Sequence, residues 1–416
     1  MSDKIKIFTI GDHPLSPSGV GTQTKYMIEG LLKTGKYEFL SFGGAITHPA
    51  HEPQATEEWG EDWIIWPVDG YGNKEMVRAM IMQQKPDILW FMTDPRFYGW
   101  LWEIENEIRK NVPMVYYHVW DNYPYPKFNR PFYLSNDHVA CISKLTHDIL
   151  QVVAPETPSS YMPHAVDGEI FKPFSEQERL EHRSTRGFAD KFLCVWNSRN
   201  ARRKQSGTVI WWFKEFLDRV GHDKAALIMH TDVKDQHGQD LEAIIHELGL
   251  TNGEVLFSQE KVSNHDLALL YNLADLTICI SDAEGFGLST LESLSCGTPI
   301  LINMTGGLQD QITDGENWFG IGLQPASKAI IGSQSVPYIY EDRLNKEDFL
   351  EALTKLYEMG HEKRSELGAM GRAYTEKQFN FDEFVKRWDV LLTKIHNENG
   401  SWDTREGYKS YEVRTF

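Results

Sequence analysis

Two carboxylates and two glycines lie close together in one stretch of the chain. Glu284 and Glu292 are eight residues apart, and Gly285 and Gly287 follow the first of them. The apolar, β-branched run 276–280 before them predicts a buried parallel strand, and helical spacing begins directly after Gly287. The stretch is therefore predicted to be a strand, a glycine-bearing turn and a helix.

This geometry directs backbone N–H groups and a helix dipole at an anion. Gly285 and Gly287 also let the backbone approach a ligand where a Cβ would obstruct it. An anion site alone has no use for acids on both sides, but a carboxylate can accept hydrogen bonds from two hydroxyl groups at once. A nucleotide sugar has an anionic diphosphate between a hexose and a ribose, so we expect a ligand of this class.

The segment EGFGLSTLESLSCGTPI, residues 284–300, resembles the Glu-x7-Glu motif of retaining glycosyltransferases of family 4. The resemblance implies that Glu284 binds the donor sugar as a catalytic group and that Glu292 holds the ribose. It also implies that the backbone between them meets sugar and phosphate. The residues concerned are Gly285, Phe286, Gly287, Leu288 and Ser289.

Strand and helix patterns alternate through both halves of the 416 residues, a length typical of two domains. The alternation predicts an α/β protein with doubly wound parallel sheets, whose ligands bind beyond the strand carboxyl ends. The resemblance covers most of the chain and implies the GT-B fold. In that fold two Rossmann-like domains face each other across a cleft, and a C-terminal helix crosses back to the N-terminal domain.

The predicted parts follow composition and the family pattern. They are an N-terminal, acceptor-side domain over 1–172, a charged, proline-marked linker over 173–190, a nucleotide-sugar-binding domain over 191–378, a bracing helix over 379–396, and a polar tail over 397–416 that we expect to be mobile. Residues 320–341 contain glycines and prolines and predict an inserted loop of unknown role.

Cations follow the first predicted strand of the second domain. Arg199 and Lys204 match the spacing of the family pattern G-R-x4-K-G, although its glycines are replaced here. A cation pair at the end of such a strand is well placed to neutralise a diphosphate, and the resemblance implies this role. We expect Arg202 and Arg203 to face solvent, with the alternative that one of them reaches the acceptor. In the same domain, the resemblance places the loop that ends at Val262 against the nucleobase.

The first domain offers two further candidates. Gly19, Val20 and Gly21 precede a predicted helix, but Thr24 stands where a dinucleotide fingerprint needs a third Gly or Ala. The resemblance implies instead that this loop faces the diphosphate. His118 ends a predicted strand, and the resemblance implies that it contacts the donor sugar near the reacting carbon.

An unusual loop rich in aromatic residues and prolines follows His118. Its aromatic rings and cations suit a stacking platform for an acceptor, whereas the alternative is an aromatic cluster that packs under a proline-stiffened loop. Both interpretations stay open. The acceptor candidates are Trp120, Asp121, Tyr123, Lys127 and Arg130.

The amino-acid composition limits the kinds of partner that the protein could bind. The net charge of −18 argues against a nonspecific nucleic-acid or anionic-membrane binder. There is no run of 18 apolar residues that would predict a transmembrane span, and no signal-peptide core at the start. The four cysteines have no C-x-x-C spacing, which predicts free buried thiols and a cytoplasmic location.

These observations predict a glycosyltransferase that moves a sugar from a UDP- or GDP-sugar to a hydroxyl group, with retention of configuration and no cofactor. No Asp-x-Asp triplet occurs, so we expect a metal-independent donor site. The expected acceptor is a glycan, and the alternative is a hydroxylated DNA base received by the aromatic loop. A nicotinamide-dependent oxidoreductase and a non-catalytic sugar-nucleotide binder are the rival classes. The sequence does not predict an oligomeric state.

Overall fold

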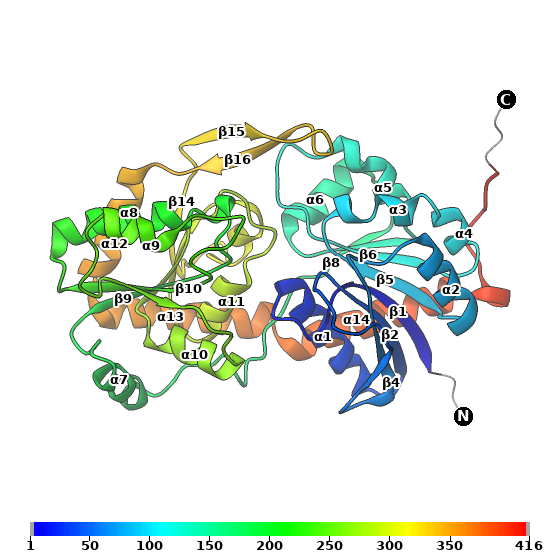
Figure 1. The fold of residues 1–416 in the computed structure, drawn as a ribbon, viewed down its shortest axis with the longest axis horizontal. Coiled ribbons are helices and arrows are strands. Elements are labelled where there is room, and N and C mark those ends of the chain that lie inside the picture. Colours follow the sequence, from blue (N-terminus) through cyan, green and yellow to red (C-terminus); the bar gives the residue numbers. More distant parts are fainter. Residues whose placement is uncertain (1–3, 413–416) are drawn as a thin grey trace. The chain divides into compact units, whose positions relative to one another are not determined.

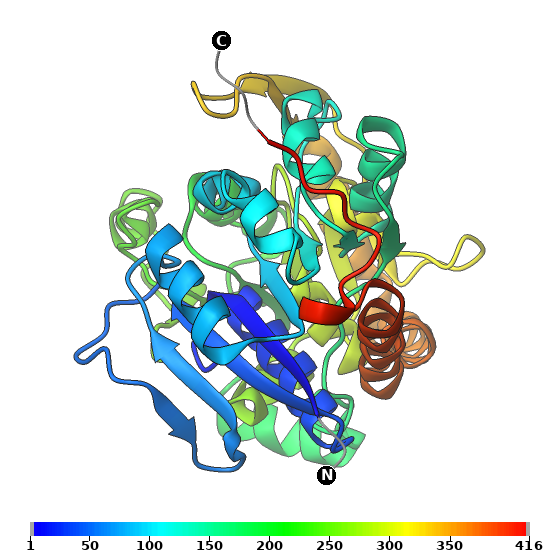
Figure 2. The ribbon, with the colours of Figure 1, turned by 90° about the vertical axis from the view of Figure 1, so that its right-hand side faces the viewer.

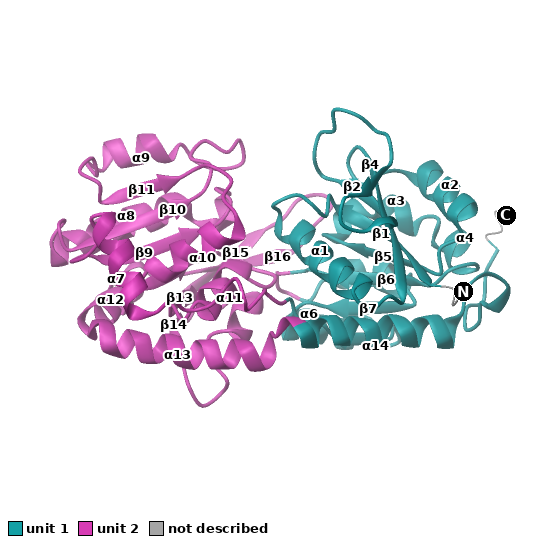
Figure 3. Ribbon diagram, turned by 90° about the horizontal axis from the view of Figure 1, so that it is seen from below, with its two compact units in different colours: residues 1–120, 125–164, 382–416 teal, residues 121–124, 165–381 magenta. Residues whose placement is uncertain are grey.

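The computed structural model describes residues 4–412 and divides into two compact units (Figure 3). Unit 1 consists of residues 4–120, 125–164 and 382–412, and unit 2 of residues 121–124 and 165–381. The chain therefore passes between units after His164, where the sequence suggested residue 172. Residues 1–3 and 413–416, which the predicted first domain and tail include, lie outside the described residues.

Unit 1 is built on a sheet that has eight strands within residues 4–412, in the order β3-β4-β2-β1-β5-β6-β7-β8. Its strand pairs are parallel apart from β3 with β4. The elements are β1 Ile5–Asp12, α1 Gly19–Leu32, β2 Tyr37–Gly44, β3 Gln54–Thr56, β4 Gly60–Pro67, α2 Lys74–Gln84, β5 Ile88–Met92, α3 Gly99–Trp102, α4 Glu105–Arg109, β6 Met114–His118, α5 Arg130–Leu134, β7 His138–Cys141, α6 Lys144–Val153, β8 Ser159–Tyr161 and α14 Phe381–Asn399 (Figure 1).

Local sequence explains these elements. All five residues of β5 and all five of β6 are buried, as expected for central strands of a parallel sheet that is covered on both faces. Asn73 caps α2 by accepting a hydrogen bond from the backbone N–H of Met76. Ser143 and Thr146 form a reciprocal capping box at the start of α6.

The last helix, α14, packs on unit 1, as the sequence predicted. The Trp388 side chain is fully buried and meets Tyr117 edge to face, with ring centroids 4.9 Å apart. The Tyr37 hydroxyl donates to the Asp389 carboxylate at 2.7 Å. Gly30 in α1 is needed because a Cβ there would collide with Val385 of α14. The helix therefore belongs to the core of unit 1.

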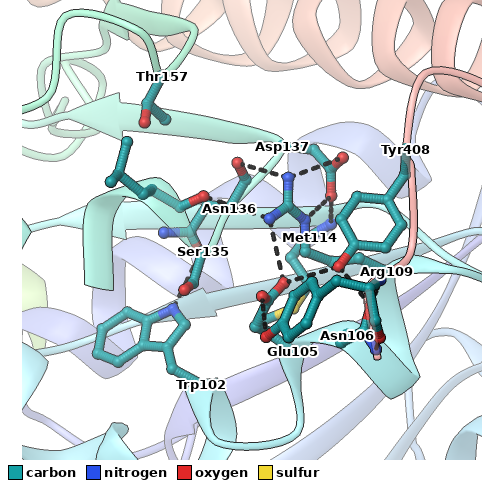
Figure 4. A network of polar contacts seen from close by, with 12 residues as sticks. Trp102, Glu105, Asn106, Arg109, Met114, Ser135, Asn136, Asp137, Thr157 and Tyr408 are labelled. Carbon is teal, nitrogen blue, oxygen red and sulfur yellow. Dashed lines mark hydrogen bonds and ion pairs between the residues drawn. The ribbon is translucent and has the colours of Figure 1, made fainter. Parts of the chain in front are cut away.

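Residues 400–411, expected to be a mobile tail, are fixed to unit 1 instead. The Trp402 indole donates to the carbonyl oxygen of Pro86 at 3.0 Å, and the Tyr408 hydroxyl donates to the Asn106 side chain at 2.8 Å. The buried Arg405 guanidinium lies 2.6 Å from Asp137, which also pairs with Arg109. Figure 4 shows the Arg109–Asp137 part of this network with Tyr408 beside it. These specific partners explain why a polar segment is ordered.

Unit 2 contains a sheet that has six parallel strands within the described range, in the order β11-β10-β9-β12-β13-β14, and a separate antiparallel pair, β15-β16. The elements are α7 Glu176–Thr185, β9 Phe192–Asn197, α8 Ser206–Val220, β10 Ala225–His230, α9 Leu241–Glu247, β11 Val255–Ser258, α10 Asn264–Leu273, β12 Leu276–Cys279, α11 Leu288–Ser295, β13 Ile300–Asn303, β14 Gly320–Leu323, β15 Ser327–Ile331, β16 Ile339–Arg343, α12 Lys346–Glu358 and α13 Gly360–Gln378 (Figure 1).

The predicted linker 173–190 forms a helix, α7, that is fixed to unit 2. The Asp275 carboxylate, just before β12, lies 2.9 Å from Arg179 and 3.1 Å from Arg183, both on α7. Arg364 of α13 approaches the same carboxylate to 3.3 Å. A charged composition suggested a linker, but these charges meet a buried acid that sequence reading alone does not connect with them.

The predicted insertion 320–341 also has defined structure. It contains the edge strand β14 and most of the β15–β16 hairpin, which stands away from the six-stranded sheet (Figures 1 and 2). No helix within residues 4–412 is long and apolar enough to cross a membrane. The four cysteines are free and buried, as predicted.

Candidate functional site

The topology of unit 2 brings two distant loops together. Strands β9 and β12 are neighbours in the sheet, with Leu276 opposite Cys194, although β10 follows on one side of β9 and β13 lies on the other side of β12. This is the point at which the strand order reverses, where ligands of open α/β sheets bind beyond the carboxyl ends. The loops 198–205 and 280–287 leave these two ends.

Glu284 is held at this point by cations. The Lys204 ammonium forms an ion pair with the Glu284 carboxylate, and both side chains are 13% exposed. The Arg203 guanidinium lies 3.7 Å from the same carboxylate and 3.6 Å from Asp121. The structure therefore brings together Lys204 and Glu284, two of the predicted site residues, and adds Arg203, which we had expected to face solvent.

Charge controls the protonation of this acid. Burial alone would raise the pKa of Glu284, but the positive charges of Lys204 and Arg203 outweigh it and hold the pKa below its ordinary value. Glu284 is therefore ionised at neutral pH. An ionised carboxylate only accepts hydrogen bonds, which is what binding of sugar hydroxyl groups requires.

The backbone that carries Glu284 rests on a second glycine pair. The Gly307 N–H donates to the Glu284 carbonyl oxygen at 2.9 Å. A side chain at Gly306, where φ is +50°, would collide with that carbonyl oxygen, and one at Gly307 would collide with the backbone of Gly285. The close contact between the backbones of residues 306–307 and 284–285 fixes the position of the Glu284 loop relative to the sheet.

Helix α11 begins at this loop without a side-chain cap. Its N-cap is Gly287, with φ +92°, and no side chain accepts a hydrogen bond from the first turn. Leu288 and Ser289 in that turn are partly exposed, whereas Gly285 and Phe286 are buried. An uncapped, accessible helix N-terminus is suited to an anion.

Phe286 has a packing role in this structure. Its ring is 3% exposed and meets Phe379 edge to face, with centroids 5.7 Å apart. The contact anchors the middle of the loop in the core. Any contact of Phe286 with a ligand would therefore be through its backbone, as the resemblance implies.

Glu292 lies on α11 one turn beyond Leu288 and is partly exposed. The Tyr271 hydroxyl donates to its carboxylate at 2.7 Å and accepts a hydrogen bond from Asn197 at 2.7 Å. Burial raises the pKa of Glu292 to about 7, although the hydrogen bond from Tyr271 acts in the opposite direction. Glu292 thus titrates near neutral pH, unlike Glu284.

Not every predicted cation of unit 2 joins this group. Arg199 is 60% exposed and pairs with Asp235 at 2.6 Å. Arg202 is 56% exposed, as expected, and pairs with the buried Glu341 carboxylate at 2.6 Å. Val262, predicted beside the nucleobase, is 38% exposed in the loop before α10. The roles of Arg199 and Val262 stay predictions.

His118 is a core residue of unit 1. Its side chain is fully buried, and its Nε2 lies 2.9 Å from the Tyr133 hydroxyl. Burial lowers the pKa of His118 to about 3, although a hydrogen bond with the backbone of Thr146 acts in the opposite direction. The ring is therefore neutral at physiological pH. Its predicted contact with a donor sugar would need a rearrangement of these neighbours.

The glycine loop of unit 1 folds over the start of α1. The Gly21 N–H donates to the Ser18 hydroxyl at 3.0 Å, and that hydroxyl donates to Asp12 at 2.6 Å. A Cβ at Gly21 would lie 2.6 Å from the His13 carbonyl oxygen, so this position requires glycine. Gly19 and Val20 form the first turn of α1. Their contact with a diphosphate stays a prediction.

The predicted acceptor loop is divided between the two units. Trp120 is 3% exposed and packs edge to face on Phe128, as the aromatic-cluster alternative predicts. Arg130 pairs with Glu156 at 2.6 Å, and Lys127 is exposed. Asp121 and Tyr123 instead make their contacts in unit 2.

Two residues of the site were missed by sequence reasoning. Arg203 stands in a basic run, and only the adjacency of β9 and β12 shows which of its cations reach Glu284. Tyr271, which holds Glu292, lies in a helix with no local signal that separates it from any buried tyrosine. Within residues 4–412 there is no group of three or more His, Cys, Asp or Glu side chains suited to a metal ion.

The fold is that of GT-B enzymes, with two Rossmann-like units. Sucrose-phosphate synthase from Thermosynechococcus elongatus superimposes with a TM-score of 0.73 at 16% identity, over 95% of this chain and 100% of that one. Anabaena Alr3699/HepE, solved in complex with UDP and glucose, gives a TM-score of 0.68 at 14% identity, over 94% and 100%.

Similarity in sequence covers a smaller part of the chain than similarity in structure. Residues 217–374, which include Glu284 and Glu292, match the family described as glycosyl transferases group 1. A D-inositol 3-phosphate glycosyltransferase from Paenarthrobacter aurescens is 31% identical over 188 residues, which are 45% of this chain. The match spans 44% of that relative, less than half of its length.

Proposed function

We propose that this chain is a glycosyltransferase that transfers a sugar from a nucleoside diphosphate sugar to a hydroxyl acceptor. The observation that carries the proposal is the position of Glu284, an ionised acid held by Lys204 and Arg203 at the reversal point of the unit 2 sheet, beside an uncapped helix N-terminus. The family match over residues 217–374, which include Glu284 and α11 but neither Arg203 nor Lys204, and the UDP and glucose of the Anabaena structure support it.

The acidic residues of the site bind hydroxyl groups of the donor, and the basic residues bind its diphosphate. Glu284 accepts hydrogen bonds from the sugar hydroxyl groups, and Glu292 accepts them from the ribose. Lys204, Arg203 and the N–H groups at the start of α11 stabilise the negative charge that develops on the departing diphosphate. Fixed charges and dipoles of this kind need no reorganisation when the bond breaks, which is why they lower the barrier.

Two finer features are part of the proposal. Transfer proceeds with retention of the anomeric configuration, and proton NMR of the fresh product reads this directly. The protein's own cations take the place of a metal ion, so activity is expected to persist in EDTA. A product of inverted configuration, or loss of activity in EDTA that magnesium restores, would refute the respective feature.

The donor is a UDP- or GDP-sugar and the acceptor a glycan. A thermal-shift screen against UDP-, GDP- and ADP-sugars tests the first statement, with NADH as a control for the oxidoreductase class. Release of nucleoside diphosphate during turnover then separates a transferase from a sugar-nucleotide binder. The absence of any stabilisation by nucleotide sugars would refute the proposed function. We do not propose the modified DNA base, because no observation on the described residues favours it.

A further inference from the structure

The hairpin of unit 2 has one exposed, largely apolar face. Strands β15 and β16 pair so that Ile330 lies opposite Tyr340 and Lys328 opposite Asp342, which places these side chains on one face. Tyr338, two residues from Tyr340, points to the same face, and the two rings meet edge to face at 5.4 Å. Ile330 is 65% exposed and Tyr338 46% exposed. Side chains of this kind are seldom left in water together.

Ion pairs attach the base of the hairpin to the loops that carry the candidate donor site. Glu341, on the opposite face, is 3% exposed and accepts two hydrogen bonds from Arg202, at 2.6 and 2.8 Å. Arg343 pairs with Asp282 at 2.6 Å, two residues before Glu284 in the chain. The Arg202–Glu341 pair is bidentate, and a bidentate pair to a buried carboxylate holds a defined geometry. An isolated two-stranded hairpin would otherwise be only marginally stable.

Residues 122–123 meet the outer edge of β16 through one isolated antiparallel bridge. Tyr123 forms an antiparallel bridge with Tyr340, whose N–H donates to the Tyr123 carbonyl oxygen, and Asn122 donates to the Tyr340 carbonyl oxygen at 2.8 Å. The Lys328 ammonium lies over the Tyr123 ring, 5.6 Å from its centroid. Asp121, the next residue back, contacts Arg203, which also contacts Glu284. These contacts therefore connect the exposed face of the hairpin with Glu284.

We propose that this face, formed by Tyr123, Ile330, Tyr338 and Tyr340, binds the acceptor of the reaction, and that the acceptor is an uncharged saccharide. The inference rests on the proposed function. A sugar ring has an apolar C–H side that stacks on an aromatic ring and hydroxyl groups that pair with phenol oxygens, so tyrosines match both of its properties.

Charge selects this occupant over others. Lys328 is the one cation on the face among the described residues, and it is already positioned over Tyr123 and 3.9 Å from Asp342. A nucleic acid or an anionic lipid surface would need several free cations. The face lacks them, whereas a neutral saccharide needs none.

The test uses the full-length protein with UDP on an array of neutral, amino and acidic saccharides. We expect the wild type to bind neutral saccharides, and the double variant Ile330→Ser/Tyr338→Ala to lose at least about tenfold in affinity, the scale of one or two stacking contacts. Tyr338→Phe, which keeps the ring and removes only the hydroxyl group, is expected to lose less affinity than the double variant. Trp211→Ala removes an equally exposed aromatic ring (45%) from α8 and serves as the matched control.

The outcomes separate the two proposals. If nucleotide sugars do not stabilise the wild type, the proposed function fails. If they stabilise wild type and double variant alike but array binding is absent or unchanged in the variant, the acceptor face fails alone. Binding to phosphatidylcholine vesicles is measured for the same two proteins. If the wild type binds vesicles but no saccharide, and the double variant loses the vesicle binding, the face contacts a membrane and the proposal of a saccharide acceptor is wrong.

Discussion

Lys204 forms an ion pair with Glu284 across 80 residues of sequence. The pair connects the loop after β9 with the loop after β12, and Arg203 reinforces it. It joins a cation suited to a phosphate with an acid suited to a sugar, which is the combination a nucleotide sugar requires.

Removing either partner of the pair is expected to reduce transfer. Lys204→Ala and Glu284→Gln should each lower kcat/KM for the donor at least ~100-fold, the usual effect of losing one preorganised contact. Because the two groups interact directly, the double variant should lose less than the product of the single effects. Lys214→Ala, which removes a partly exposed lysine from α8, controls for the change in net charge. Wild-type kinetics in both single variants would contradict the assignment.

Arg199 provides a comparison within the same loop. It matches the family pattern as well as Lys204 does, but it is exposed and paired with Asp235. We therefore expect Arg199→Ala to reduce kcat/KM less than Lys204→Ala. An equal loss in steady-state assays would show that Arg199 leaves Asp235 for the donor.

Glu292 predicts a pH dependence of donor binding. Its pKa of about 7 means that the carboxyl group becomes protonated as pH falls through neutrality, and a protonated carboxyl accepts ribose hydroxyl groups less well. The donor KM should therefore rise as pH falls from 8 to 6. Glu292→Gln should have a weaker affinity that no longer changes over this range.

The same group affects stability in the opposite direction. Because the folded pKa is above the ordinary value of 4.5, the folded state binds more protons between these values, and stability declines as pH rises through this window. Chemical denaturation of wild type and Glu292→Gln at pH 5 and pH 7.5 measures the difference. A pH effect of the same size in both proteins would mean that another group is responsible.

Gly306 is expected to be intolerant of a side chain. Gly306→Ala would force the methyl group into the Glu284 carbonyl oxygen and shift the loop, so donor turnover should fall together with stability. Gly249→Ala is the matched control because its φ is also positive, at +69°, but nothing lies within 4 Å of the added carbon. The control should lose only about 1–2 kcal/mol of stability, the cost of the left-handed backbone, with normal turnover. Equal activity in the two variants would argue against the close approach.

Asp275 is expected to be important for stability alone. Burial would raise its pKa, but a hydrogen bond from His361 and the charges of Arg183, Arg179 and Arg364 hold the pKa below its ordinary value. Asp275→Asn leaves these cations without their partner and should lower the free energy of unfolding by about 3–5 kcal/mol.

The sign of the accompanying pH effect follows from the depressed pKa. The stabilisation by Asp275 is present above the ordinary aspartate value of 3.8 and is lost as pH falls below it. Denaturant titrations should therefore show a smaller difference between wild type and Asp275→Asn at acidic pH. Asp190→Asn, at an exposed position of the same unit, should change stability by less than about 0.5 kcal/mol.

Some features of the fold could be read from the chain because they are local. The alternation of apolar strands and amphipathic helices predicted the doubly wound α/β class, and the C-terminal helix was correctly placed on the first unit. The tail and the segment 173–190 were misread since their polar side chains meet partners far away in sequence, such as Asp137 and Asp275. Composition cannot show such partners.

The same division applies to the candidate site. By itself, the sequence determined the strand–turn–helix carrying Glu284 and Glu292, because short-range glycine, apolar and helical spacing specify that geometry. Only the tertiary structure decided that Arg203 and Lys204 contact Glu284 while Arg199 contacts Asp235. It also decided that the Tyr271 hydroxyl donates a hydrogen bond to the Glu292 carboxylate. The reason is physical. Two loops meet when the strands before them are adjacent in the sheet, and the order of the strands follows from the packing of the whole unit and not from any local pattern.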